Sequence, residues 1–222
     1  MPEFADFTFA EKLYMGLANV ERIFIAELDP VYCVVAAVLV LLVYRKTGDY
    51  RKTLLAGIPA LLLFGQAVVR VSHPSLKKVF VRPEQTTHWD WHALVTYMPL
   101  VFLVLSVWGI LYALWQLADG VWKHYLWTAF LLAGGFAMGV VMGFSPTIYA
   151  SANRPYLYLY FVLIYVCADA VWNMGGMKAV WKTGSSDAVR KMPVPEKLMF
   201  TVLGLLVLAN ILDVTRMCWL LG

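Results

Sequence analysis

Charged residues are scarce in this sequence. Only 14% of its 222 residues are Asp, Glu, Lys or Arg, whereas about 25% is usual for a soluble domain. The hydrophobic share is 61%, the mean hydropathy is +0.69, and the apolar residues occur in long blocks. This composition argues against an ordinary soluble domain and is typical of a membrane protein. The net charge of +4 is better interpreted loop by loop than as a sign of nucleic-acid binding.

Several chemical signatures are also missing. The sequence has no Walker A loop, no dinucleotide fingerprint, no HExxH and no GxSxG motif, so nothing in it supports a soluble-type active site. Its three cysteines, Cys33, Cys167 and Cys218, lie in apolar runs without paired spacing, and we expect packing thiols. The N-terminal residues lack the basic start of a cleavable signal peptide, so we expect the later spans to direct insertion.

The apolar blocks predict an all-α integral membrane protein with about six transmembrane helices, because each approaches the roughly 20 residues needed to cross a bilayer. The predicted spans are 30–44, 53–70, 93–117, 124–143, 155–175 and 198–221. Residues 1–29 mix aromatic and charged side chains, which indicates an amphipathic helix lying at the interface. We expect residues 30–222 to form a single transmembrane domain.

Lys and Arg near the span ends predict the orientation. They are more frequent in 45–52, 118–123 and 176–197, which we expect to be cytoplasmic, and both termini and the loops 71–92 and 144–154 should then lie outside. Aromatic residues crowd the predicted outer boundary, and we interpret most of them as interfacial anchors; they are Trp89, Trp91, Tyr149, Tyr156, Tyr158 and Tyr160.

The fourth predicted span ends in glycines at every fourth position, Gly135, Gly139 and Gly143. A strip of this kind lets another helix backbone approach closely and could also support a homo- or hetero-oligomer. We expect the helix to end near Ser145 and Pro146, because proline cannot continue it.

The outer loop that follows is rich in hydrogen-bonding groups, among them Ser145, Thr147, Tyr149 and Arg154. It could be a solvated turn with its arginine reaching lipid phosphates, or it could bind an anion or a sugar. Three arginines are predicted near the outer boundary, and together they would suit a phosphate; they are Arg70, Arg154 and Arg216.

The other outer loop contains His88, Asp90 and His92. These side chains could hold a divalent metal, or the segment could cap the next helix and anchor it by its tryptophans. Asp90 could instead be a general base. Within the fifth span, Asp169 and Asn173 stand one turn apart, and we expect Asp169 to bond across helices.

The segment MGFSPTIYASANRPYLYLYFVLIYV, residues 142–166, resembles an uncharacterised family of bacterial polytopic membrane proteins. That family looks related to GT-C type glycosyltransferases and to surface-polysaccharide assembly enzymes. The resemblance implies a polyprenyl-phosphate sugar as donor, a bacterial cell membrane and an outward-facing site. The positions that match are Ser145, Pro146, Thr147, Tyr149, Ser151 and Arg154.

The chain departs from the GT-C pattern in two respects. GT-C enzymes generally have more spans than the six predicted here. They also carry a catalytic carboxylate in the first external loop, after a first span, and here only Glu27 and Asp29, which precede the first predicted span, could take that place. From the resemblance, the first hypothesis is surface-glycan assembly, with Asp90 or Asp29 as the base and no required cofactor. The alternative is a non-enzymatic membrane module, such as a small transporter, a channel or an accessory subunit.

Overall fold

The structure is a computed structural model, and it describes residues 4, 6–72, 94–118, 120–145 and 156–173. Within these ranges the chain is all-helical and contains no strand. The elements in chain order are α1 (Phe9–Glu21), the π-helix η2 (Arg22–Ala26), α2 (Pro30–Thr47), α3 (Tyr50–Ala56), α4 (Ile58–Ser72), α6 (Leu94–Leu117), α7 (Trp122–Val141), the 3₁₀-helix η3 (Met142–Phe144) and α8 (Leu157–Asn173).

Three of these helices are long and apolar enough to cross a membrane: Pro30–Thr47, Tyr97–Leu117 and Trp122–Phe144. The shorter apolar helices are Ile58–Val68 and Leu157–Asn173. Large apolar side chains such as Phe64, Val104 and Phe130 are about two-thirds exposed on the outside of the bundle. Continuous apolar exposure of this kind is compatible with a membrane location.

The described helices follow part of the predicted pattern. The first, third and fourth predicted spans correspond to the three long apolar helices, and α8 lies within the fifth. The second predicted span is divided at Gly57 into α3 and α4, because Pro59 follows at a helix start. The sixth, 198–221, lies outside the described residues, so six spans stay a prediction.

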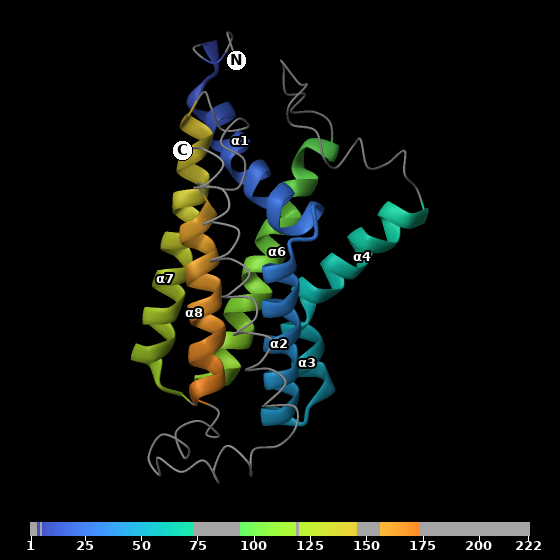
Figure 1. The fold of residues 1–222 in the computed structure, drawn as a ribbon, viewed down its shortest axis with the longest axis vertical. Coiled ribbons are helices and arrows are strands. Elements are labelled where there is room, and N and C mark those ends of the chain that lie inside the picture. The colour runs from blue at the N-terminus through green and yellow to red at the C-terminus, as the bar shows by residue number, and fades with distance from the viewer. Residues whose placement is uncertain (1–3, 5, 73–93, 119, 146–155, 174–222) are drawn as a thin grey trace, which may run out of the picture.

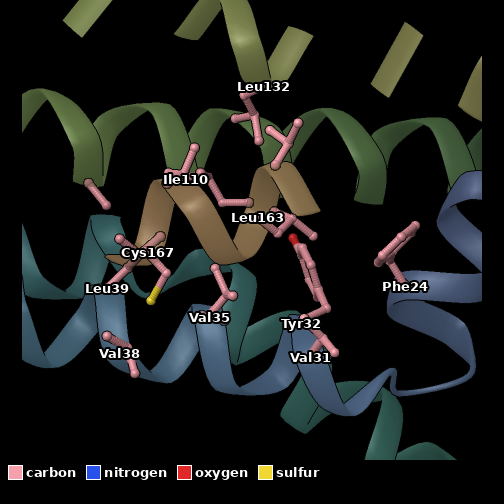
Figure 2. Close-up of a cluster of buried hydrophobic side chains, with 14 of the residues drawn as sticks. Phe24, Val31, Tyr32, Val35, Val38, Leu39, Ile110, Leu132, Leu163 and Cys167 are labelled. Carbon is pink, nitrogen blue, oxygen red and sulfur yellow. The ribbon is translucent and has the colours of Figure 1, made fainter. Parts of the chain in front are cut away.

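α2, α6 and α8 run in one direction and α7 runs in the opposite direction, and the four helices enclose the apolar core (Figure 1). Figure 2 shows Val35 and Leu39 of α2 facing Ile110 of α6 and Leu163 of α8. Cys167 is buried in the same cluster and Cys33 is partly buried, both as free thiols, as expected for packing cysteines. α4 diverges from α7 and α8 towards its C-terminal end (Figure 1).

α1 packs against α6, α7 and η3. It begins with a capping box, in which Thr8 Oγ1 accepts from the backbone N–H of Glu11 and the Glu11 carboxylate accepts from Thr8. Seven of its residues are buried, among them Met15, Asn19 and Glu21. α1 is therefore part of the helical bundle, and its placement relative to a bilayer stays a prediction.

The predicted glycine strip of α7 contacts helices of the same chain. A Cβ on Gly135 would lie 2.9 Å from Leu159 of α8, and one on Gly139 would lie 2.8 Å from Val20 of α1. A Cβ on Gly143 would lie 2.7 Å from the Cα of Gly16. The close helix approach that the spacing predicts is thus confirmed within one chain.

Candidate functional site

The junction between α1 and α2 is the most irregular backbone that the structure describes. α1 continues into η2, where the N–H of Glu27 donates to the carbonyl of Arg22 at 2.7 Å, one residue further than in an α-helix. Leu28 then adopts a positive φ of 57°, and Asp29 caps α2 ahead of Pro30. π-Helical turns often occur at functional sites, and this one brings several polar residues together.

Asp29, which the sequence proposes as a catalytic carboxylate, connects α2 with α8. Its Oδ1 accepts the backbone N–H of Tyr32 at 2.9 Å, and its Oδ2 accepts the hydroxyl of Tyr160 at 2.7 Å. Burial raises the pKa of the Asp29 carboxyl, and these hydrogen bonds counteract part of that increase. The side chain is thus oriented by two helices while it stays partly accessible.

A second group of contacts involves residues that precede Asp29 and Tyr160 in the sequence. Nδ2 of Asn19 donates to the Tyr156 hydroxyl, and Nε of Arg22 donates to Oδ1 of Asn19 at 3.0 Å. Nη1 of Arg22 also pairs with the Glu27 carboxylate at 3.4 Å. The Arg22 side chain is 14% exposed and that of Glu27 is 38% exposed, so this ion pair reaches the surface of the bundle.

Aromatic rings hold the two groups of contacts beside each other. The Phe24 ring of η2 lies 5.9 Å from the ring of Tyr32, 6.1 Å from that of Tyr156 and 5.1 Å from that of Tyr160. Edge-on and tilted pairs at these distances are favourable. Phe24 therefore fixes η2 against the N-terminal ends of α2 and α8.

Glu21 is the most deeply buried acid of this region, with 2% of its surface exposed. Burial raises its pKa from 4.5 to about 8. Burial, together with the charge of Glu21, also raises the pKa of Tyr14 to about 12. Among the described residues, the Glu21 carboxyl forms no hydrogen bond and no ion pair, so the neutral form is favoured there.

The polar residues of this junction are defined here as the junction site. Its members are Asn19, Arg22, Glu27, Asp29, Tyr156 and Tyr160. With two carboxyl groups and one guanidinium, the site suits hydroxyl groups of a neutral ligand better than a phosphate. Among the described residues, no group of three His, Cys, Asp or Glu side chains is arranged to hold a metal.

The structure brings only one of the proposed site residues into the junction site, namely Asp29. Ser145 follows η3, its N–H donating to the carbonyl of Met142 at 3.0 Å, so the helix ends where the sequence predicts. Arg70 lies in the last turn of α4, which diverges from α7 and α8 (Figure 1). The remaining proposed residues lie outside the described ranges; they are Thr147, Tyr149, Arg154, Arg216, His88, Asp90 and His92.

Two of the tyrosines interpreted as interfacial anchors face the protein interior instead. Tyr156 is 0% exposed and Tyr160 is 7% exposed, whereas Tyr158 between them is 47% exposed. The anchor interpretation is wrong for the first two, because a spacing of four places them on one helix face that meets α1 and α2. The four-residue spacing of Tyr156 and Tyr160 was the signal in the sequence that could have revealed their shared buried face. Asn19 and Arg22 were missed because nothing in the sequence shows that α1 lies beside Tyr156, which precedes α8.

The opposite end of the bundle carries a separate polar group. Nε2 of His124 on α7 lies 2.8 Å from Oδ2 of Asp169 on α8, and Nδ2 of Asn173 lies 3.1 Å from Oδ1 of Asp169. The prediction that Asp169 bonds across helices is thus confirmed. This pair connects α7 with α8 and lies far from the junction site along the helices (Figure 1).

Comparisons of the chain with protein family models, with curated proteins and with solved structures gave no match.

Proposed function

We propose that this protein acts in surface-glycan assembly at a cell membrane and that the junction site receives the acceptor hydroxyl for transfer of a polyprenyl-phosphate sugar. The observation that carries the proposal is the placement of Asp29. This carboxylate is held by Tyr32 and Tyr160 at the end of an apolar helix, which is where a headgroup would meet the protein. The resemblance of residues 142–166 to glycan-assembly proteins supplies the substrate class.

The proposed reaction is a single nucleophilic displacement at the anomeric carbon of the donor sugar. Asp29 takes the proton of an acceptor hydroxyl, and the resulting oxygen attacks the anomeric carbon of the donor sugar. The bond between that carbon and the phosphate oxygen breaks, and its electron pair leaves with the polyprenyl phosphate. A carboxyl with a raised pKa is better suited to accept a proton than an ordinary aspartate, and its fixed orientation supplies the positioning.

The division of charge supports separate places for acceptor and phosphate. The junction site pairs its one guanidinium, Arg22, with Glu27, so a phosphate would meet a nearby negative charge. Phosphate binding is therefore assigned to Arg154 and Arg216, with Arg70 as a third candidate, as the sequence predicts. A divalent metal at His88, Asp90 and His92 is not needed for this reaction.

A non-enzymatic membrane module is the second candidate, and a specific observation favours it. Both oxygens of Asp29 already have partners within the chain, one of which caps α2. A structural role in joining α2 and α8 is sufficient to explain these two hydrogen bonds. In that case the polar contacts and the glycine strip stabilise a module that assembles with other proteins.

Replacing Asp29 by asparagine separates the two candidates. Asparagine caps helices as well as aspartate. Its oxygen can accept the N–H of Tyr32 and its NH2 can donate to the hydroxyl of Tyr160, but it cannot take up a proton. Asp49→Asn is the matched control, because Asp49 caps α3 through the N–H of Arg51 at 2.8 Å and lies away from the junction site. The assay is transfer of radiolabelled sugar from a panel of polyprenyl-phosphate hexoses in membranes that contain each variant.

We expect Asp29→Asn to lower transfer by about 10²- to 10⁴-fold, the usual contribution of a general base, and Asp49→Asn to leave it unchanged. Arg154→Gln should raise the donor concentration needed for half-maximal transfer. Full transfer by Asp29→Asn would show that Asp29 is structural. Absence of transfer by the wild-type protein with every donor would favour the non-enzymatic module.

A further inference from the structure

An apolar groove lies between α2, α3 and α4. α3 lies at the opposite end of the bundle from the junction between α1 and α2 (Figure 1). Its volume is about 440 Å³, within the usual range for ligand sites. The groove is open along its length, and its walls are almost entirely apolar. It is lined by Val40, Tyr44, Tyr50, Thr53, Leu54, Gly57, Ala60 and Leu61.

Gly57, where α3 ends and α4 begins, lines the groove. The N–H of Gly57 still donates to the carbonyl of Thr53 at 2.8 Å, so α3 and α4 remain joined end to end. A Cβ on Gly57 would lie only 3.6 Å from Cγ2 of Val40, so a larger residue would fill the space between α2 and this pair. The hydroxyl of Thr53, a lining residue, is already bonded to the carbonyl of Asp49 at 2.8 Å.

Cationic side chains surround the end of the groove. The Arg51 guanidinium lies 5.8 Å from the ring of Tyr50, a lining residue, and its Nε donates to the Tyr50 hydroxyl at 3.3 Å. Arg45 and Lys52 are exposed beside the lining residues Tyr44 and Thr53. Asp49 is the nearby acid, and its carboxylate accepts from the backbone of Arg51 in capping α3. The local charge stays positive.

Lys46, in the last turn of α2, contrasts with Arg51 of α3. Its Nζ donates to the carbonyl of Leu117 at 2.8 Å, so this cation joins α2 to the end of α6. Arg51 is held differently, because its aromatic partner Tyr50 lines the groove and its Nη groups form no hydrogen bond or ion pair with another described residue. A guanidinium held by a tyrosine at the end of an apolar groove is suited to a phosphate whose attached chains enter that groove.

We propose that this groove binds an anionic phospholipid, with an acyl chain against Leu54 and Leu61 and the phosphate beside Arg51 and Lys52. Basic pockets between helices on the cytoplasmic side of membrane proteins have this ligand chemistry. The orientation predicted from the sequence places the 45–52 loop on that side. The exposed lining side chains support the same occupant, since Tyr50 is 70% exposed and Leu54 is 58% exposed on an apolar surface.

Native mass spectrometry of the full chain in detergent tests this inference, with palmitoyl-oleoyl phosphatidylglycerol and palmitoyl-oleoyl phosphatidylcholine added at equal concentrations. We expect the wild-type protein to retain phosphatidylglycerol preferentially. The double variant Arg51→Gln/Lys52→Gln should lose about fivefold of that preference for each cation removed. Lys123→Gln is the matched control, because Lys123 is exposed on α7, which does not border the groove.

Leu54→Trp tests the groove itself. The larger ring fills the space from an exposed position, so it should lower retention of both lipids without unfolding the chain, which circular dichroism checks. An unchanged lipid preference in the double variant would overturn the proposal. So would an equal loss in Lys123→Gln, or full lipid retention by Leu54→Trp.

Discussion

Replacing Gly16 by alanine should destabilise the bundle, because α1 and α7 touch through their backbones at this point. A Cβ on Gly16 would overlap the carbonyl oxygen of Val140 and lie 2.9 Å from its carbonyl carbon, whereas ordinary contacts begin at 3.4 Å. The neighbouring atoms belong to a helix backbone and not to a flexible side chain. α1 would therefore have to move away from α7.

The size of the effect follows from two opposing contributions. Alanine favours a helix over glycine by about 0.8–1.0 kcal/mol, whereas overpacking a well-packed site costs about 1–3 kcal/mol. Gly134→Ala on α7 is a matched control, because a Cβ there would meet nothing within 4 Å. Both variants gain the same helix preference, so the difference in their free energies of unfolding isolates the overpacking cost, about 1–3 kcal/mol.

Unfolding of both variants in detergent by increasing guanidinium, followed by circular dichroism, measures that difference. We expect the order of stability Gly134→Ala, wild type, Gly16→Ala. The midpoints should be compared at a constant slope, because a changed slope would mean that the extent of unfolding differs. If Gly16→Ala is as stable as Gly134→Ala, then α1 does not pack on α7 by backbone contact, and the junction site loses its support.

Three further predictions concern buried groups and orientation. Ser106→Ala should destabilise the bundle by about 1–3 kcal/mol, because the buried Tyr32 hydroxyl loses its partner, and the double variant with Tyr32→Phe should recover part of that loss in the same unfolding assay. Glu21 has a folded-state pKa of about 8, above its ordinary 4.5, so the folded state binds more protons and the free energy of unfolding should fall as the pH rises from about 5 to 8. Glu21→Gln should remove this pH dependence in unfolding curves measured across that range. The same pH dependence in both proteins would contradict the prediction. In a variant without its native cysteines, a cysteine at position 75 should be labelled from outside intact cells and one at position 185 should not, and the reverse pattern would refute the predicted orientation.

Much of the helical pattern could be predicted from composition alone. The predicted spans 93–117 and 124–143 agree closely with α6 and α7, because long apolar blocks without charges leave few other structures in a membrane. Asp29 was singled out through the GT-C resemblance, as one of two acids before the first span that could take the catalytic place. The end of α7 near Ser145 followed from the proline that comes next.

Other features depended on which helices meet. Nothing in the sequence of residues 1–29 indicates that Asn19 contacts Tyr156 or that Gly16 contacts α7. An amphipathic pattern shows that one face is apolar, and it does not show whether lipid or protein covers that face. The tyrosines of α8 illustrate the same point, since alternate ones face the interior and the exterior.

The sequence by itself determined that this chain forms apolar helices, where several of them begin and end, and that glycines would let two helices approach closely. These properties follow from the local cost of burying polar groups and from backbone preferences, which act over a few residues. Only the tertiary structure decided that α1 and α8 cover the glycine strip, that Asp29 bonds to Tyr160, and that α3 and α4 enclose a groove with α2. Such contacts join residues up to 137 positions apart, and their free energy depends on the shapes of both surfaces at once.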